Sequence, residues 1–189
     1  KVMVDLGSET VVVDRDHPDQ QEVFSSKTTW VNYPDWSPKG DKIAFSAHTP
    51  RDQGKESTWG VYLCDNEGDN FQRILSDARK PEWNPQGTKI AYQLLKPGSP
   101  DRLAVADADG SNAHPVTTGG IQQNEWSWDP QGHQIAYETY KDGNFQLRVT
   151  DFTGTKDRLL SDGQGGTYKD RTPEWSPKGD KILFERHDR

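Results

Sequence analysis

The chain repeats one motif four times, first as Pro34-Asp-Trp-Ser-Pro-Lys-Gly-Asp-Lys-Ile-Ala-Phe45. The other three copies are residues 81–92, 126–137 and 173–184, and the aligned tryptophans are Trp36, Trp83, Trp128 and Trp175. Successive tryptophans are 47, 45 and 47 residues apart in this chain of 189 residues. A period this regular indicates that one structural unit is repeated along the chain.

Each copy of the motif predicts a strand, a tight turn and a second strand. The step Trp-Ser-Pro-Lys-Gly is typical of a strand that ends in a turn, because proline fixes φ and glycine accepts a positive φ. The following Lys-Ile-Ala-Phe continues as a strand. A second motif of the form Val-x-Val-x-Asp-x-x-Gly and a short apolar run follow, with copies at 61–68, 103–110 and 147–154 and a shorter copy at 2–7. Each repeat therefore holds about four short strands.

Four-stranded units at this spacing predict an all-β propeller. We expect a single domain over 1–189, with repeats at about 33–79, 80–120 and 121–166, and a last repeat at 167–189 that 1–32 completes. Strands at about 1–14 would pair with strands at about 171–185, which closes a ring of four blades of four antiparallel strands and removes free sheet edges. The expected state is a monomer. The alternatives are a piece of a six- to eight-bladed protein and an eight-bladed ring of two chains.

Composition argues against several classes of protein. The 30 acidic and 23 basic residues give a net charge of −7, which does not suit a nucleic-acid-binding surface. A single cysteine, Cys64, excludes an internal disulfide, and its apolar neighbours predict that it is buried and unreactive. No apolar run approaches the roughly 18 residues of a membrane helix. Because common catalytic motifs such as Gly-x-Ser-x-Gly and His-Glu-x-x-His are also missing, we predict that the chain is not an enzyme.

Carboxylates precede three of the four repeated tryptophans, namely Asp35, Glu82 and Glu174. The innermost strands of a propeller meet around its axis, so these oxygen ligands could share a cation such as Ca²⁺ there. The other interpretation is that they point between blades and pair with basic side chains. Arg79 and Arg171, three residues before the carboxylates of their own repeats, favour this second interpretation. Apart from such an axial cation we expect no cofactor.

Loops between the repeats differ, and binding residues are expected there. The connection at 46–60 is the longest of its kind and ends near Trp59, a tryptophan outside the repeat pattern. The connections that lead into the inner strands should surround one mouth of the propeller. The candidate ligand-binding residues are polar or aromatic: Trp30, Asn32, Trp59, Gln122, Gln123, Asn124, Tyr168 and Arg171. Such a set suits a glycan or a peptide end, although each residue could also lie in a solvated loop or cap a blade.

The two motifs together resemble the repeat of the TolB-type propellers over nearly the whole chain. The best copies are 33–45 and 172–184, and the weakest is 126–137, where Trp126 replaces proline and Asp129 replaces serine. The resemblance implies a bacterial protein of the periplasm or one that is secreted. The same repeat also occurs beside catalytic domains of the prolyl oligopeptidase type and in some pectin-oligomer lyases, so the resemblance implies a fold more strongly than a function.

The predicted function is that of a non-catalytic TolB-like scaffold, which recognises a protein segment or a glycan at one face of the propeller. One alternative is a carbohydrate-active enzyme, a lyase or hydrolase with a rim or channel site. Another is a structural module of a larger propeller assembly. An enzyme should show titratable side chains within about 3–4 Å of a common point, a binder an exposed aromatic mouth, and an assembly module an unpaired blade edge.

Overall fold

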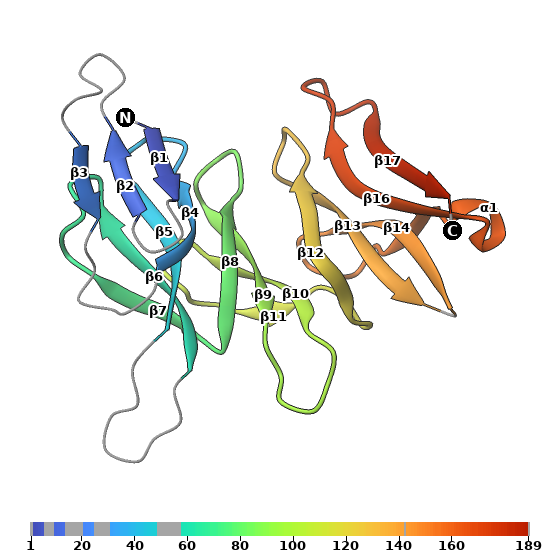
Figure 1. Ribbon diagram of the computed structural model, residues 1–189, viewed down its shortest axis with the longest axis horizontal. Helices are drawn as coiled ribbons and strands as arrows, with labels where there is room; N and C mark the ends of the chain where they lie inside the picture. Colours follow the sequence, from blue (N-terminus) through green and yellow to red (C-terminus); the bar gives the residue numbers. More distant parts are fainter. Residues whose placement is uncertain are drawn as a thin grey trace. The chain divides into compact units, whose positions relative to one another are not determined.

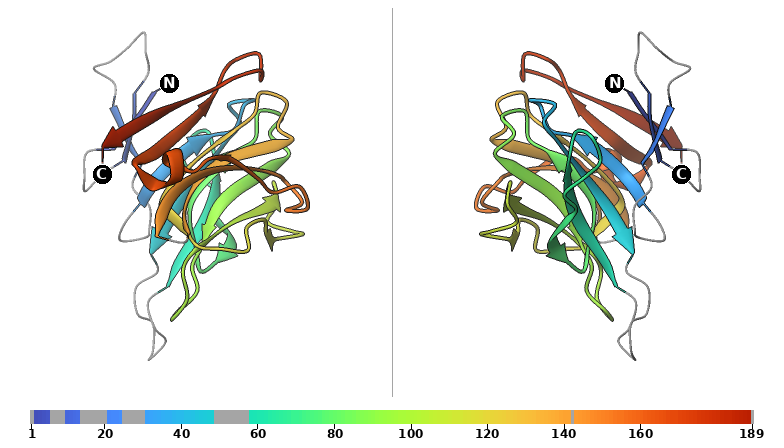
Figure 2. Two further views of the ribbon diagram at one scale, coloured as in Figure 1. Left: turned by 90° about the vertical axis from the view of Figure 1, so that its right-hand side faces the viewer. Right: turned by 90° about the vertical axis from the view of Figure 1, so that its left-hand side faces the viewer.

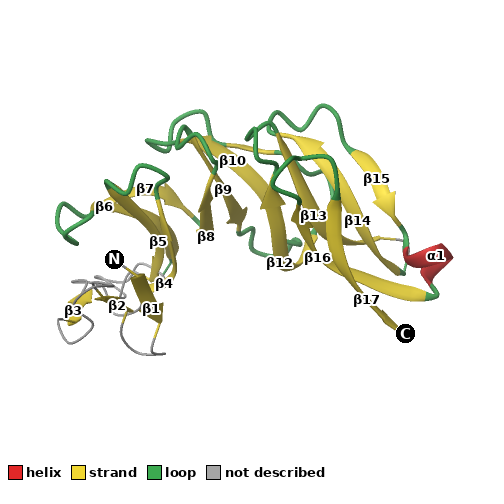
Figure 3. Cartoon of the chain, turned by 90° about the horizontal axis from the view of Figure 1, so that it is seen from above, coloured by secondary structure: helices red, strands yellow, loops and turns green. Residues whose placement is uncertain are grey.

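The computed structural model describes residues 2–5, 10–13, 21–24, 31–48, 58–141 and 143–188, the first three segments and 122–124 by their backbone only. These residues form seventeen strands and one short helix, which confirms the predicted all-β class. The chain divides into two compact units, residues 1–83 and 84–189. Figure 3 shows how the strands follow one another through short loops within each unit.

The first unit holds two antiparallel sheets (Figure 1). One is three-stranded in the order β1-β2-β3, with β1 (Val2–Asp5), β2 (Thr10–Val13) and β3 (Gln21–Phe24). The other is four-stranded in chain order, with β4 (Val31–Trp36), β5 (Lys42–His48), β6 (Trp59–Asp65) and β7 (Gln72–Ser76). This second sheet has the four antiparallel strands predicted for one repeat.

Strand β8 (Ala78–Trp83) packs against the four-stranded sheet of the first unit. The backbone N–H of Trp83 donates to a carboxylate oxygen of Asp35 over 2.7 Å, and the N–H of Lys80 donates to Ser46 Oγ over 2.7 Å. Side chains on β5 and β6, such as Phe45, form the buried core beside these contacts. Polar side chains of one repeat thus bind the backbone of the next.

The second unit continues the pattern. Strands β9 (Lys89–Leu94), β10 (Arg102–Asp107) and β11 (His114–Pro115) are neighbours in one antiparallel sheet. A complete four-stranded sheet follows, with β12 (Ile121–Trp128), β13 (Gln134–Lys141), β14 (Asn144–Asp151) and β15 (Arg158–Ser161). Figure 3 labels these four strands, and Figure 2 shows the chain from two further sides. The short helix α1 (Gly163–Gly166) leads into the antiparallel pair β16 (Tyr168–Trp175) and β17 (Ile182–Asp188). Buried aromatic residues, including Trp126, Trp128 and Tyr137, fill the core.

The turns of the repeat form for the local reasons that the sequence suggests. In the first copy, Ser37 Oγ accepts the N–H of Lys42 over 3.0 Å and Gly40 has φ of +69°. In the third copy, Asp129 Oδ1 takes the role of the serine and accepts two backbone N–H groups. The substitution that weakens the family pattern at Asp129 therefore preserves the turn, because a carboxylate accepts the same hydrogen bonds as a hydroxyl.

The inner strands contain a feature that the sequence analysis does not predict. The residue before the proline of the motif has a positive φ in three repeats, at Tyr33 (53°), Lys80 (49°) and Thr172 (49°). The pairing register shifts at this point in β4 and again in β16, as in a β-bulge. A bulge bends the strand and changes the direction of neighbouring side chains, which matters for Arg79 and Arg171 below.

The predicted ring closure stays a prediction. It requires the N-terminal strands and β17 to share a sheet, but the described backbone places β1–β3 in one sheet and β16–β17 in another. These strands belong to different units. The predicted repeat boundaries are likewise untested.

Candidate functional site

A cluster of aromatic and basic side chains lies in the first unit around Trp59, one of the predicted binding residues. We call Tyr33, His48, Trp59 and Arg79 the Arg79 cluster. The guanidinium carbon of Arg79 lies 4.6 Å from the ring centroid of Trp59 and 5.6 Å from that of Tyr33. The rings of His48 and Trp59 meet edge to face, with their centroids 5.0 Å apart. Tyr33 remains 43% exposed, so this cluster presents an aromatic and cationic surface to solvent.

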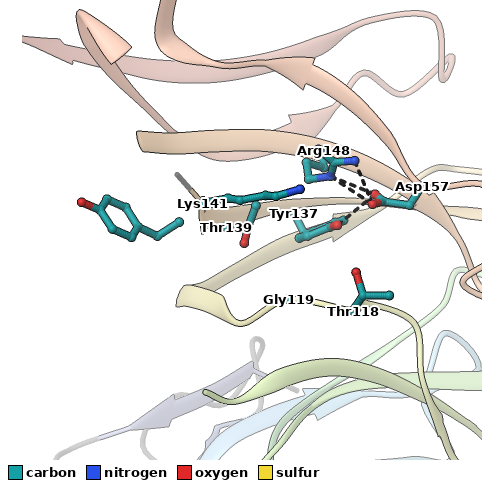
Figure 4. A pocket seen from close by; sticks show the side chains of 8 residues that line it. Thr118, Gly119, Tyr137, Thr139, Lys141, Arg148 and Asp157 are labelled. Atoms are coloured by element: carbon teal, nitrogen blue, oxygen red, sulfur yellow. Dashed lines mark hydrogen bonds and ion pairs between the residues drawn. The ribbon is translucent and has the colours of Figure 1, made fainter. Parts of the chain in front are cut away.

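A pocket of about 270 Å³ lies entirely in the second unit, between β13, β14 and the loop before β12 (Figure 4). We call it the Tyr137 pocket. Its lining residues are mostly polar: Thr118, Gly119, Tyr137, Thr139, Tyr140, Lys141, Arg148 and Asp157. The pocket forms because Tyr137 and Arg148 are opposite each other in the β13–β14 register, while Asp157 comes from the loop before β15.

Three side chains of the Tyr137 pocket bind one another (Figure 4). The Tyr137 hydroxyl donates to Asp157 Oδ1 over 2.9 Å, and Arg148 Nε donates to both oxygens of Asp157 over 3.0 and 3.1 Å. Burial raises the pKa of Tyr137 above its ordinary value, and the charge of Asp157 adds to this effect. The hydrogen bond to Asp157 raises the pKa of Arg148 in turn. Both groups therefore keep their protons at neutral pH and donate hydrogen bonds to Asp157.

Lys141 differs from the other charged residues of this pocket. Its side chain is exposed, and it forms no ion pair within the described parts of the chain. Thr139, by contrast, is buried and donates to the backbone oxygen of Gly120 over 2.6 Å. The pocket thus combines a fixed hydrogen-bonding wall with one cation at its rim.

The predicted binding residues fall in both units. Asn32 and Trp59 lie in the first, on β4 and β6, and Tyr168 and Arg171 lie on β16 in the second. Trp30 lies outside the described residues, and Gln122, Gln123 and Asn124 are described only as backbone of β12. Their gathering at one mouth therefore stays a prediction.

The residues of the Tyr137 pocket are absent from the sequence-based prediction. Tyr137 occupies the aromatic position that ends the repeat motif, where Phe45 and Phe184 stand in two other copies. Tyr92 stands at the same position in the remaining copy, so the hydroxyl of Tyr137 alone did not mark a site. The partners Arg148 and Asp157 carry no signal either, because strand pairing alone brings them to the tyrosine.

The predicted axial cation is not decided by the described residues. Among them, no group of three or more His, Cys, Asp or Glu side chains is arranged to hold a metal ion. Asp35 and Glu82 lie in the first unit and Glu174 in the second. The carboxylate of Asp35 accepts the backbone N–H of Trp83, and burial raises its pKa to about 6. Among the described residues its partner on the next repeat is thus a backbone group, and the choice between the two interpretations stays a prediction.

Cys64 conforms to the prediction. It is buried among apolar residues of β5 and β6, and burial, reinforced by the charge of Asp65, raises the pKa of the thiol to about 12. No helix in the described residues is long and apolar enough to cross a membrane.

Comparison with solved structures gives folds that match most of the chain. TolB from Acinetobacter baumannii matches with a TM-score of 0.69 and 19% identity over 93% of this chain and 42% of its own. A putative TolB from Agrobacterium tumefaciens matches with a TM-score of 0.77 and 20% identity over 98% of this chain and 65% of its own. An oligogalacturonate lyase in complex with manganese matches with a TM-score of 0.69 and 17% identity over 93% of this chain and 50% of its own. At these identities the likeness concerns the fold alone.

The chain spans between 42% and 65% of the length of these three proteins. Comparison with curated proteins finds no match. A family model described as the TolB beta propeller domain matches residues 3–189. This match agrees with the repeated turns and the four-stranded antiparallel sheets described above. The chain therefore belongs to the TolB beta propeller domain family.

Proposed function

We propose that this chain is a non-catalytic binding scaffold, which recognises a protein segment or a glycan through polar and aromatic side chains at its surface. The observation that carries the proposal is the pairing inside the Tyr137 pocket. Asp157, the carboxylate that could act as a base, already accepts hydrogen bonds from Tyr137 and Arg148. A general base must instead be available to a proton of the substrate.

The size and lining of the pocket support a small polar group as ligand. A volume of about 270 Å³ is near the lower limit for ligand pockets, so it suits one side chain or one sugar ring. Thr118 and Lys141 are exposed at its edge and can donate hydrogen bonds. The Arg79 cluster adds an aromatic and cationic surface of the kind that protein-binding sites often use.

Array binding with the purified chain tests this function. We expect hits on a peptide or glycan array that Lys141→Ala weakens severalfold, because the rim cation is lost. Lys96→Ala is the matched control, since Lys96 is an exposed lysine of the same unit that does not line the pocket. Failure of every peptide and glycan to bind would contradict the proposed function, and equal binding by the Lys141 variant would contradict the role of the Tyr137 pocket in it.

The enzymatic alternative rests on the fold that this chain shares with the oligogalacturonate lyase. Incubation with oligogalacturonate, with and without manganese, separates it from the binding function. Bond cleavage by β-elimination produces an unsaturated sugar that absorbs in the ultraviolet. Turnover that depends on the protein would replace the proposed function, whereas binding without turnover supports it.

We further propose that the N-terminal strands complete the sheet of β16 and β17. Leu183 on β17 is 76% exposed, while Ala44 and Ala136, at the same position of the motif in β5 and β13, are fully buried. Both of those strands have a neighbour on each side, but β17 has one described partner. A further strand beside β17 would cover Leu183 and satisfy the strand edge.

Hydrogen exchange and solution mass test this closure. Deleting residues 1–24 should remove the exchange protection of β17 amides while that of β13 persists, and the intact chain should have the mass of a monomer. A dimer would favour the ring of two chains instead. Unchanged protection of β17 after the deletion would refute closure by these strands. A periplasmic or secreted location is part of the same proposal and follows from the family resemblance.

A further inference from the structure

We propose that Arg79 is a binding site for a carboxylate of an acidic protein or peptide ligand. The inference rests on the proposed binding function and names the chemistry of its ligand. It comes from a comparison of two arginines at the same position in two repeats of this chain. Arg79 and Arg171 both stand two residues before the proline of the motif.

Both arginines lie against an aromatic ring at the start of a neighbouring strand. Arg79 lies over Trp59, the first residue of β6, and Arg171 over Phe145, near the start of β14, with the guanidinium carbon 5.6 Å from the ring centroid. An aromatic face restricts the guanidinium to one plane and replaces part of its hydration. The two repeats therefore pack an arginine against an aromatic ring in the same way.

The two repeats differ in the counter-charge. Arg171 Nε donates to Glu138 Oε2 over 3.3 Å, and Glu138 is fully buried. The equivalent of Glu138 in the first unit is Ser46, which follows the aromatic residue that ends the motif in the same way. Ser46 Oγ accepts the N–H of Lys80, just as Glu138 accepts the N–H of Thr172. Serine thus keeps the backbone contact but supplies no negative charge.

Arg79 consequently contacts aromatic rings but no carboxylate among the residues that the structure describes. In the described part of the first unit its contacts are the rings of Trp59 and Tyr33, and its Nε is buried without a hydrogen-bond acceptor. The half-buried guanidinium has lost hydration that the two rings replace only in part. An incoming carboxylate can bind the guanidinium with two parallel hydrogen bonds, a geometry that lysine cannot match.

The arrangement of the rings favours a protein ligand over a sugar acid. A sugar ring usually stacks on a free aromatic face, but Arg79 already lies over the Trp59 ring and His48 packs against it. Arg79 is half-buried, and its guanidinium lies beside the exposed ring of Tyr33. A glutamate or aspartate side chain, or a chain terminus, reaches the edge of a guanidinium without stacking.

Fluorescence anisotropy with a labelled oligoglutamate peptide at low salt tests the inference, with oligoglutamine as the neutral probe. The wild-type chain should bind oligoglutamate more tightly than oligoglutamine. Arg79→Gln should weaken oligoglutamate binding about tenfold or more, and Arg79→Lys should restore only part of it. Lys39→Gln removes an exposed positive charge of the same unit that lies outside the Arg79 cluster, so it should leave binding nearly unchanged.

A second variant tests the comparison of the repeats directly. Ser46→Glu places in the first unit the carboxylate that Glu138 supplies in the second, so it should pair with Arg79 and abolish peptide binding without loss of thermal stability. If this variant does not fold, the two Arg79 variants still decide the question. Circular dichroism establishes that each variant is folded.

Several outcomes would overturn the inference. The first is that the wild-type chain binds oligoglutamate and oligoglutamine with equal affinity. The second is that Arg79→Gln, or a folded Ser46→Glu variant, still binds oligoglutamate as tightly as wild type. The third is that the chain binds oligogalacturonate but not oligoglutamate. If array ligands still bind through the Tyr137 pocket, the carboxylate site fails while the binding function stands. If no peptide or glycan binds at all, both fail.

Discussion

Replacing Asp35 with asparagine should stabilise the protein at neutral pH and remove part of its pH dependence. The side chain of Asp35 accepts the N–H of Trp83 over 2.7 Å at the contact between β4 and β8. Burial raises the pKa of this carboxyl from 3.8 to about 6, against the opposing effect of its backbone hydrogen bonds. Folding therefore disfavours the ionised form of Asp35.

The sign and size of the effect follow from the difference between the folded and unfolded states. Below a pH of about 4, Asp35 is protonated in both states and has no influence on stability. Between about 4 and 6 the unfolded chain loses the proton first, so the free energy of unfolding falls as the pH rises. Above this range the loss is complete. One pKa unit corresponds to about 1.4 kcal/mol, so the full loss is roughly 2 to 3 kcal/mol.

Asparagine keeps an oxygen that can accept the Trp83 N–H but has no charge to desolvate. The free energy of unfolding of Asp35→Asn should thus exceed that of wild type by roughly 1 to 3 kcal/mol near pH 7 and by little near pH 4. Urea titration followed by tryptophan fluorescence at several pH values measures the difference. Asp77→Asn is the matched control, because Asp77 is exposed in the same unit and asparagine also tolerates its φ of +50°. If Asp35→Asn is no more stable than wild type near pH 7, or shows the same pH slope, burial does not govern this carboxyl.

Three further predictions concern the second unit and the core. Asp170 is fully buried and accepts two hydrogen bonds from Arg186, over 2.7 and 2.8 Å, which lower its pKa. Asp170→Asn should therefore reduce the free energy of unfolding by roughly 2 kcal/mol at neutral pH, and this difference should shrink as the pH falls and Asp170 becomes protonated. A loss that does not depend on pH in urea titration would contradict this. Gly163→Ala should lower the melting temperature more than Gly165→Ala. Both residues have φ near +70°, but only at Gly163 would the new methyl group meet a backbone oxygen of β16. Equal decreases in melting temperature would show that this contact has no effect. Cys64, with a pKa of about 12, should react with a thiol reagent at mildly alkaline pH only after urea unfolding, and rapid labelling of the native protein would disprove its burial.

The strands and turns could be predicted from the sequence because they depend on residues that are close together in the chain. Ser37 binds the N–H of Lys42, five residues later, and a carboxylate does the same at Asp129. Proline and glycine restrict φ at the positions between them. This chemistry is complete within each copy of the motif, so four copies predict the same structure four times.

The Tyr137 pocket could not be predicted in this way. Asp157 lies twenty residues from Tyr137, and Arg148 reaches both through the register of β13 and β14. A shift of that register by one residue would turn Arg148 to the other face of the sheet, although the sequence would read the same. Trp59 could be singled out because it is an aromatic residue outside the repeat pattern, but its contact with Arg79 depends on the packing of β8.

Arg79 and Arg171 show which features the sequence determined and which only the tertiary structure determined. The sequence by itself determined the repeat, its strands and turns, and the equivalence of the two arginines, because all of these follow from local stereochemistry and period. Only the tertiary structure decided that Arg171 meets the carboxylate of Glu138, 33 residues earlier, and that Arg79 meets two aromatic rings and no carboxylate among the described residues. The reason is physical: the charge that a side chain meets depends on which strand packs beside it, and packing joins residues that no local pattern connects.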